Sequence, residues 1–195
     1  MPAQFFLERE KDENSNFQYN VDMKSFRFSP IKDQAQLLKA IEHIHFECHK
    51  LCKQRLGYLL PVAGNVGVFC HFEDEFVLLT KIRKQLTDIN NNWNSKYFKL
   101  HKPIVISAKD GVPETTYTYL YIRKPDDHTP NVGDVDFYME PNKYSALKQS
   151  LLSGKTMKGV MIFDRPDLDL IRLFDPKIDA SSFVGQKTMA ENVRS

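Results

Sequence analysis

The chain has 195 residues, of which 42% are hydrophobic and 27% charged, and its formal net charge is +2. This length supports one well-packed core, and a charge so close to zero gives no field of the kind that a dedicated nucleic-acid-binding protein requires. No run approaches the ~20 apolar residues that would cross a bilayer. We therefore expect no nucleic-acid partner and no membrane partner.

The number of cysteines bears on the cellular compartment of the protein. There are three, Cys48, Cys52 and Cys70, and an odd, sparse set argues against a disulfide framework. The first residues, Met1–Gln4, lack the basic and then apolar organisation of a secretory signal. The sequence therefore predicts a cytoplasmic protein, and it leaves open whether the chain forms a homo-oligomer.

The first part of the chain predicts an arm followed by a helix. Residues 1–30 mix charged side chains with phenylalanines, which is too aromatic a composition for a simple disordered tail, so we expect an arm that packs partly on the body. Residues 31–58 predict a leading helix that ends at Gly57. Its apolar positions recur at spacings of three and four and are Leu37, Ile41, Ile44, Cys48 and Leu51.

The rest of the chain predicts two similar modules, at 65–123 and 134–175, and a C-terminal tail at 176–195. The elements expected in the first module are a strand at 65–72, a helix at 73–88, extended segments at 97–100 and 104–108, and a strand at 115–123. Those expected in the second are a strand at 134–139, a helix at 141–153, and strands at 160–163 and 168–174. The predicted fold is an α+β domain over residues 31–185.

Several segments resemble the bacterial YecM protein family in their order and approximate spacing. They are Asn65–His71, Tyr97–Ile104, Tyr121–Pro125, Asp134–Phe137 and Ile171–Pro176. That family belongs to the vicinal-oxygen-chelate superfamily, which includes glyoxalases and extradiol dioxygenases. The resemblance implies two βαβββ modules whose mixed sheet curves around a cleft, with a divalent metal held by histidine and carboxylate side chains.

The resemblance also implies where the metal ligands would lie, early on the first strand and late on the last strand of each module. The corresponding positions here are Asn65, Arg123, Asp134 and Arg172. Asp134 is a suitable ligand and Asn65 a weak one, but a guanidinium has no lone pair to give. We therefore predict no cofactor, and a divalent metal is implied by the family resemblance alone.

Two inward-pointing arginines would instead suit a carboxylate or a phosphate. Asp136 and Tyr138 share a strand face with Asp134, and Tyr121 lies near Arg123, so these three residues are further candidates for lining the cleft. The alternative hypothesis is structural: Arg123 pairs with Asp134 and fills the pocket, while Arg172 extends to water.

A second cluster lies on the leading helix. His45, Cys48, His49 and Cys52 follow one side of the helix at i, i+3, i+4 and i+7, and these residue types bind zinc. However, Cys48 also belongs to the apolar stripe, where a free cysteine behaves as a small hydrophobe. The cluster is therefore either a zinc site or part of the core.

Three functions are compatible with these features. The first is a metal-free protein that binds a small anionic ligand in the cleft. The second is an enzyme with a modified site, either a metal-dependent lyase, isomerase or dioxygenase, or one that uses Asp134 as a general base. The third is a protein-interaction module that uses the N-terminal arm. The sequence does not decide whether the protein is an enzyme, and it favours the first function because two cationic side chains occupy ligand positions.

Overall fold

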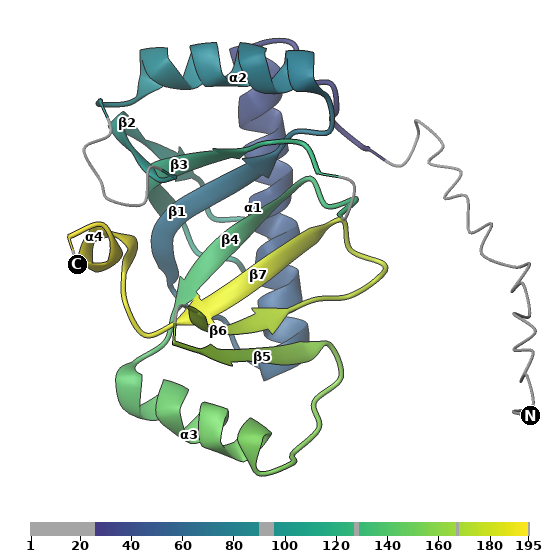
Figure 1. Cartoon of the computed structure of the whole chain (residues 1–195), viewed down its shortest axis with the longest axis vertical. Helices are drawn as coiled ribbons and strands as arrows, with labels where there is room; N and C mark the ends of the chain where they lie inside the picture. Colours follow the sequence, from purple (N-terminus) through teal and green to yellow (C-terminus); the bar gives the residue numbers. More distant parts are fainter. Residues whose placement is uncertain (1–25, 90–95, 127–128, 167, 195) are drawn as a thin grey trace, which may run out of the picture.

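The computed structural model describes residues 26–89, 96–126, 129–166 and 168–194, and these form an α+β fold (Figure 1). The elements are α1 (Gln34–Leu56), β1 (Val62–Phe69), α2 (Glu73–Leu86), β2 (Phe98–Ile106), β3 (Thr115–Arg123), β4 (Gly133–Tyr138), α3 (Pro141–Leu152), β5 (Val160–Arg165), β6 (Leu168–Leu173), β7 (Ala180–Gly185) and α4 (Met189–Asn192). The predicted fold class, with its leading helix, is confirmed. None of the helices in the described ranges is long and apolar enough to span a membrane.

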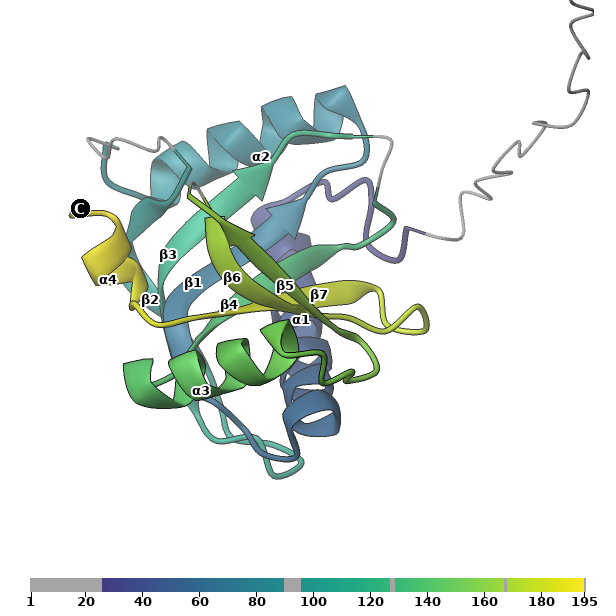
Figure 2. The same ribbon diagram turned by 60° about the horizontal axis from the view of Figure 1, so that its bottom comes forward.

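The strands form one mixed, curved sheet in the order β2-β3-β1-β4-β7-β6-β5 (Figures 1 and 2). At its centre β1 and β4 run antiparallel. Each of these two strands has a parallel neighbour on its outer side, β3 beside β1 and β7 beside β4. The sheet therefore consists of two halves of similar topology joined through β1 and β4.

The two halves differ from the prediction in three ways. The first half is βαββ, because the segments expected at 97–100 and 104–108 form the single strand β2, whose pairing with β3 shifts register between Lys99 and Ile104. The second half is βαβββ but extends to Gly185. The segment at 176–195, predicted as a tail, contains β7 and α4, and β7 hydrogen-bonds between β4 and β6.

Helix α1 forms where the apolar stripe predicts it and packs behind the centre of the sheet (Figure 1). At its start the Asp33 side chain accepts a hydrogen bond from the Gln36 backbone amide at 2.8 Å, which satisfies one of the free N–H groups of the first turn. At its end Gly57 has φ 85°, a conformation that glycine adopts without steric cost. All five predicted apolar positions are fully buried, and burial of a large apolar side chain contributes ~1.5–3 kcal/mol.

The strands present two chemically different faces. Alternate residues such as Val66, Val135 and Leu173 lie in the hydrophobic core with α1. The residues between them point to the opposite face, because successive side chains of a strand alternate. That opposite face carries Asn65 of β1, Asp134 and Asp136 of β4, Arg123 of β3 and Arg172 of β6, and we call it the polar face.

Glu75 of α2 fixes the segment that precedes α1. Its carboxylate is 2% exposed and accepts hydrogen bonds from the backbone amides of Ile31 at 2.7 Å and His71 at 2.9 Å and from the Ser29 hydroxyl. The Phe26 ring stacks on His71 with the ring centroids 3.8 Å apart. Part of the predicted arm, residues 26–30, thus packs on the body, whereas residues 1–25 lie outside the described residues.

Candidate functional site

Two carboxylates occupy the middle of the polar face. Asp134 and Asp136 are alternate residues of β4, and both side chains are largely buried. Asp134 pairs with Gly67 of β1 across the antiparallel ladder. A Cβ atom at position 67 would lie 2.1 Å from Asp134 Oδ1, so the absence of a side chain at Gly67 creates the space that the carboxylate occupies.

Burial controls the protonation of this pair. Desolvation raises the pKa of Asp136 to about 6, although the side chains of Asn65 and Tyr97 donate hydrogen bonds that oppose the shift. The Asn65 amide nitrogen lies 2.8 Å from Asp136 Oδ2. The pKa of Asp134 is also raised, first by burial and then by the neighbouring Asp136, while Arg123 and Arg172 lower it without offsetting the rise.

Arg123 closes one side of the face. Its guanidinium forms an ion pair with Asp126 and lies 4.6 Å from the centroid of the Phe69 ring. The direct carboxylate partner of Arg123 is therefore Asp126, three residues further along the chain, and not Asp134 as the structural hypothesis supposed. Tyr121, on the same face of β3, has its ring 5.7 Å from that of Tyr97, and burial raises the pKa of its hydroxyl.

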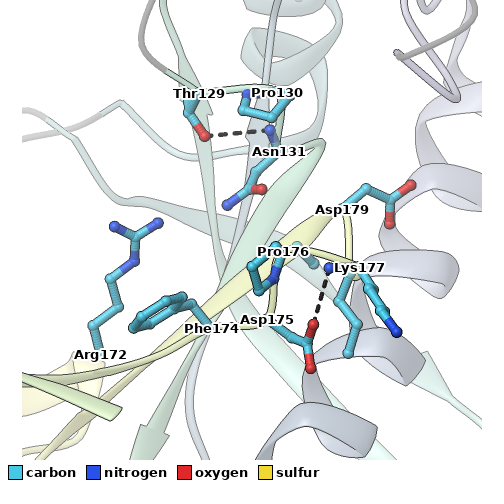
Figure 3. A pocket seen from close by; sticks show the side chains of 11 residues that line it. Thr129, Pro130, Asn131, Arg172, Phe174, Asp175, Pro176, Lys177 and Asp179 are labelled. Carbon is cyan, nitrogen blue, oxygen red and sulfur yellow. Dashed lines mark hydrogen bonds between the residues drawn. The ribbon is translucent and has the colours of Figure 1, made fainter. Parts of the chain in front are cut away.

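Arg172 lies on the other side, at the edge of a cavity of about 370 Å³. The cavity forms where β6 ends and β4 and β7 begin. In Figure 3 the guanidinium end of Arg172 points toward the Asn131 side chain, with the Phe174 ring beside it. The Arg172 Nε atom is buried, and in the described ranges it has no hydrogen-bond partner and Arg172 forms no ion pair.

Each carboxylate in the cavity wall already has an arginine partner. Asp175 forms an ion pair with Arg55 of α1. Asp179 contacts Arg27 Nε at 3.0 Å and His43 Nε2 at 2.7 Å. Within the described residues, the ion pairs of these two carboxylates therefore do not involve Arg172.

Arg172 lies on the predicted strand, β6, but this strand is not the last one of its half. Segment 168–174 was expected to be the last strand of its module, but the last strand is β7, and it pairs with β4 as β3 pairs with β1. The two halves can be superimposed by aligning Asn65 of β1 with Asp134 of β4. Four residues further along, Phe69 of β1 pairs with Arg123, and Tyr138 of β4 pairs with Gly185. The counterpart of Arg123 in the second half is therefore Gly185. Arg172 reaches the site from β6, one strand further out.

The divalent metal of the resembled superfamily does not fit this site. Of the four positions, two carry guanidinium groups, which cannot coordinate a cation, and Gly185 offers no side-chain ligand in their place. Within the described ranges, no three histidine, cysteine, aspartate or glutamate side chains are arranged to hold a metal ion. Tyr138, the remaining predicted residue, lies on the same face of β4 as the two aspartates.

The cluster on α1 is divided among separate hydrogen bonds. Its members are His45, Cys48, His49 and Cys52. The Cys48 thiol donates to the Ser181 carbonyl at 3.3 Å and the Cys52 thiol to the Tyr58 carbonyl at 3.5 Å. His45 Nδ1 lies 2.8 Å from the Tyr117 hydroxyl, and burial, followed by His49, lowers the pKa of His45 to about 3. Burial raises the pKa of the Cys52 thiol to about 11 and also raises that of the Cys48 thiol. Both thiols are therefore protonated, and they donate hydrogen bonds within the core.

Three residues of the cavity were not predicted from the sequence: Asn131, Phe174 and Lys177. They lie in the β3–β4 and β6–β7 connections or at the end of β6, which approach each other only once β7 has paired between β4 and β6. Their local sequence carries no signal for this arrangement. The prediction of β7 would have been needed to find them.

No protein-family model matches the chain, and no curated protein matches it. Two solved structures of Streptomyces coelicolor methylmalonyl-CoA epimerase, a member of the vicinal-oxygen-chelate superfamily, are similar to it, and both are variants in complex with 2-nitronate-propionyl-CoA. Each shares 15% sequence identity, covers 65% of this chain and 98% of the epimerase, and has a TM-score of 0.28. A similarity of this size assigns no activity, and the YecM resemblance remains an inference from the sequence segments.

Proposed function

We propose that the protein binds a small anionic molecule, a carboxylate or a phosphate, on the polar face at Arg172, without a metal. The observation that carries the proposal is the buried, unpartnered Nε of Arg172 at the cavity. A buried donor that lacks an acceptor costs ~1–3 kcal/mol, and more when the group is charged. An anion that accepts from this guanidinium would remove the cost.

The charges around the cavity favour the same ligand. Arg55 and Arg27 form ion pairs with the carboxylates of the wall, so those carboxylates do not repel an anion strongly. Lys177 adds a second cationic side chain and Asn131 an amide donor. The cavity volume of about 370 Å³ suits a small metabolite, since ligand sites usually enclose ~300–1,000 Å³.

The test is a titration of the full chain with simple carboxylates and phosphates, followed by differential scanning fluorimetry and calorimetry. We expect at least one anion to bind and Arg172→Gln to weaken its binding by ~10- to 100-fold, because a hydrogen bond to a charged group contributes ~1.5–3 kcal/mol. Arg165→Gln, at an exposed position of the adjacent strand β5, is the matched control. The absence of binding by every anion, or equal affinity for the wild type and Arg172→Gln, would refute the proposal.

A second candidate function is acid–base catalysis by Asp134. The raised pKa of this partly buried carboxyl group favours it, because a carboxyl group with a raised pKa binds its proton more strongly and can exchange it with a ligand. Exchange of a ligand proton for deuterium, followed by NMR in heavy water, would test it. Exchange that continues unchanged in Asp134→Asn would exclude this role.

A further inference from the structure

No donor among the described residues forms a hydrogen bond with the side-chain oxygen of Asn65. Asn65 is 1% exposed, and its amide nitrogen donates to Asp136 at 2.8 Å. That bond directs Oδ1 away from Asp136, and within the described part of the chain this oxygen has no partner. Buried polar atoms are nearly always hydrogen-bonded, so an orphaned acceptor on the polar face indicates a donor supplied from outside the chain.

The neighbours of Asn65 are also hydrogen-bond acceptors. Asp134 and Asp136 project from the same face of β4, and an ionised carboxylate only accepts hydrogen bonds. The donors that reach Asp136 are the Asn65 amide and the Tyr97 hydroxyl, which are both uncharged. Three acceptor groups therefore share this part of the polar face, and within the described residues none of them is hydrogen-bonded to a cationic side chain.

The nearby arginines do not supply this cation. The guanidinium of Arg123 is held by Asp126 and by the face of Phe69. The guanidinium of Arg172 forms no ion pair with a described residue and points toward Asn131 at the cavity. A divalent metal needs about six oxygen ligands, whereas this region offers two carboxylates and one amide oxygen beside two fixed positive charges.

A protonated amine matches the region. An ammonium group is compact, carries one positive charge and has three N–H donors and no acceptor. Each donor could meet one of the three groups, Asp134, Asp136 and the Asn65 oxygen. Hydrogen bonds of this kind, between a cation and a carboxylate, are about twice as strong as those between neutral groups.

The sheet register places this amine region within reach of Arg172. Asp136 of β4 pairs with Phe183 of β7, and Phe183 pairs with Arg172 of β6. Since neighbouring strands lie ~4.8 Å apart, the two backbones are separated by roughly 10 Å. Arg172 and Asp136 therefore lie on the same face of the sheet with one strand between them.

We propose that Asp134, Asp136 and Asn65 bind a protonated amine, so that the ligand whose anionic group contacts Arg172 is a zwitterion of the amino-acid class. This inference rests on the proposed function and specifies its ligand. It assigns the two ends of the polar face to opposite charges: Arg172 receives the carboxylate, and the β4 aspartates receive the ammonium group.

The experiment compares matched ligands that differ only in the amine. The full chain is screened with the common amino acids and with their deaminated analogues, such as alanine and propionate or aspartate and succinate, and affinities are measured by calorimetry. We expect the amino acid of at least one pair to bind ~10- to 100-fold more tightly than its analogue, as charge-assisted hydrogen bonds predict. In Asp134→Asn/Asp136→Asn this preference should vanish, while Arg172→Gln should weaken the binding of both members.

The outcomes separate this inference from the proposed function. If the analogue binds through Arg172 and the amine adds nothing, the amine assignment is wrong and anion binding stands. If no member of any pair and no simple anion binds, both are wrong. Stabilisation by Mg²⁺ or Ca²⁺ that is lost in Asp134→Asn/Asp136→Asn would overturn the amine assignment in favour of a metal. Circular dichroism of each variant checks that it is folded.

Discussion

Replacing Asp136 with asparagine should stabilise the protein at neutral pH. Asp136 is a buried carboxylate whose pKa burial raises from 3.8 to about 6, and it shares the polar face with the second carboxylate, Asp134. Above that pH the folded protein must keep the group ionised where water solvates it poorly. Asparagine has nearly the same shape and keeps a side-chain oxygen that can accept from Asn65, but it carries no charge.

The size of the effect follows from the two pKa values. Between pH 3.8 and about 6 the folded state holds the Asp136 proton while the unfolded state releases it, so the free energy of unfolding falls as the pH rises through this window. Each pKa unit corresponds to 1.36 kcal/mol, and the loss is on the order of 3 kcal/mol when the window has been crossed. Asp136→Asn removes this contribution.

Urea-induced unfolding of the wild type and Asp136→Asn, followed by circular dichroism, measures the difference. We expect the variant to be more stable by about 3 kcal/mol near pH 8 and by less than about 1 kcal/mol near pH 4. Asp110→Asn, at an exposed turn residue with φ 53°, controls for the loss of one surface carboxylate. A stability difference that is the same at both pH values, or a variant less stable than the wild type near pH 8, would refute the reasoning.

Two further predictions concern groups that hold the site in place. Glu75→Ala should lower the free energy of unfolding by ~3–5 kcal/mol in urea titrations, because it leaves the buried amide of Ile31 and that of His71 without their acceptor; a loss below about 1 kcal/mol would contradict this role. Gly67→Ala should cost ~1–3 kcal/mol and weaken amine binding in calorimetry, because the new methyl group meets the Asp134 carboxylate. Unchanged affinity in a folded Gly67→Ala protein would show that Asp134 does not contact the ligand.

The sequence could predict those elements whose patterns are local. The stripe from Leu37 to Leu51 identified α1, and the run Thr115–Arg123 identified β3 with its observed bounds. Alternation along β4 also placed Asp134 and Asp136 on one face before the sheet was known. Each of these inferences needs the residues of a single element, and that is why they held.

Strand β7 lacked such a pattern. Its residues Ser181 and Ser182 are buried but small and polar, so the segment reads as a loop in a hydropathy pattern. Small residues are needed here because α1 packs against β7 closely enough for the Cys48 thiol to reach the Ser181 carbonyl. The position of Arg172 depended on β7, and no local pattern encodes the order of strands in a sheet.

The carboxylate pair was found from the sequence, but its partners were not. The Asp134–Arg123 pair considered there is replaced by Asp126, which lies in the loop after β3. The same limit applies to Glu75, whose buried role depends on backbone amides 44 and four residues away. Charged side chains pair with the groups that lie nearest in the folded structure. Sequence spacing predicts which groups these are only within one helix or strand.

The contact between Arg27 and Asp179 has a practical consequence for work with shortened chains. A protein trimmed beyond Arg27 loses the arginine partner of Asp179, and a less neutralised carboxylate then lies in the wall of the cavity. Such a protein could fold normally and still bind its ligand weakly, particularly at low ionic strength. Affinities measured on chains of different starting residue are therefore comparable only when Arg27 is retained.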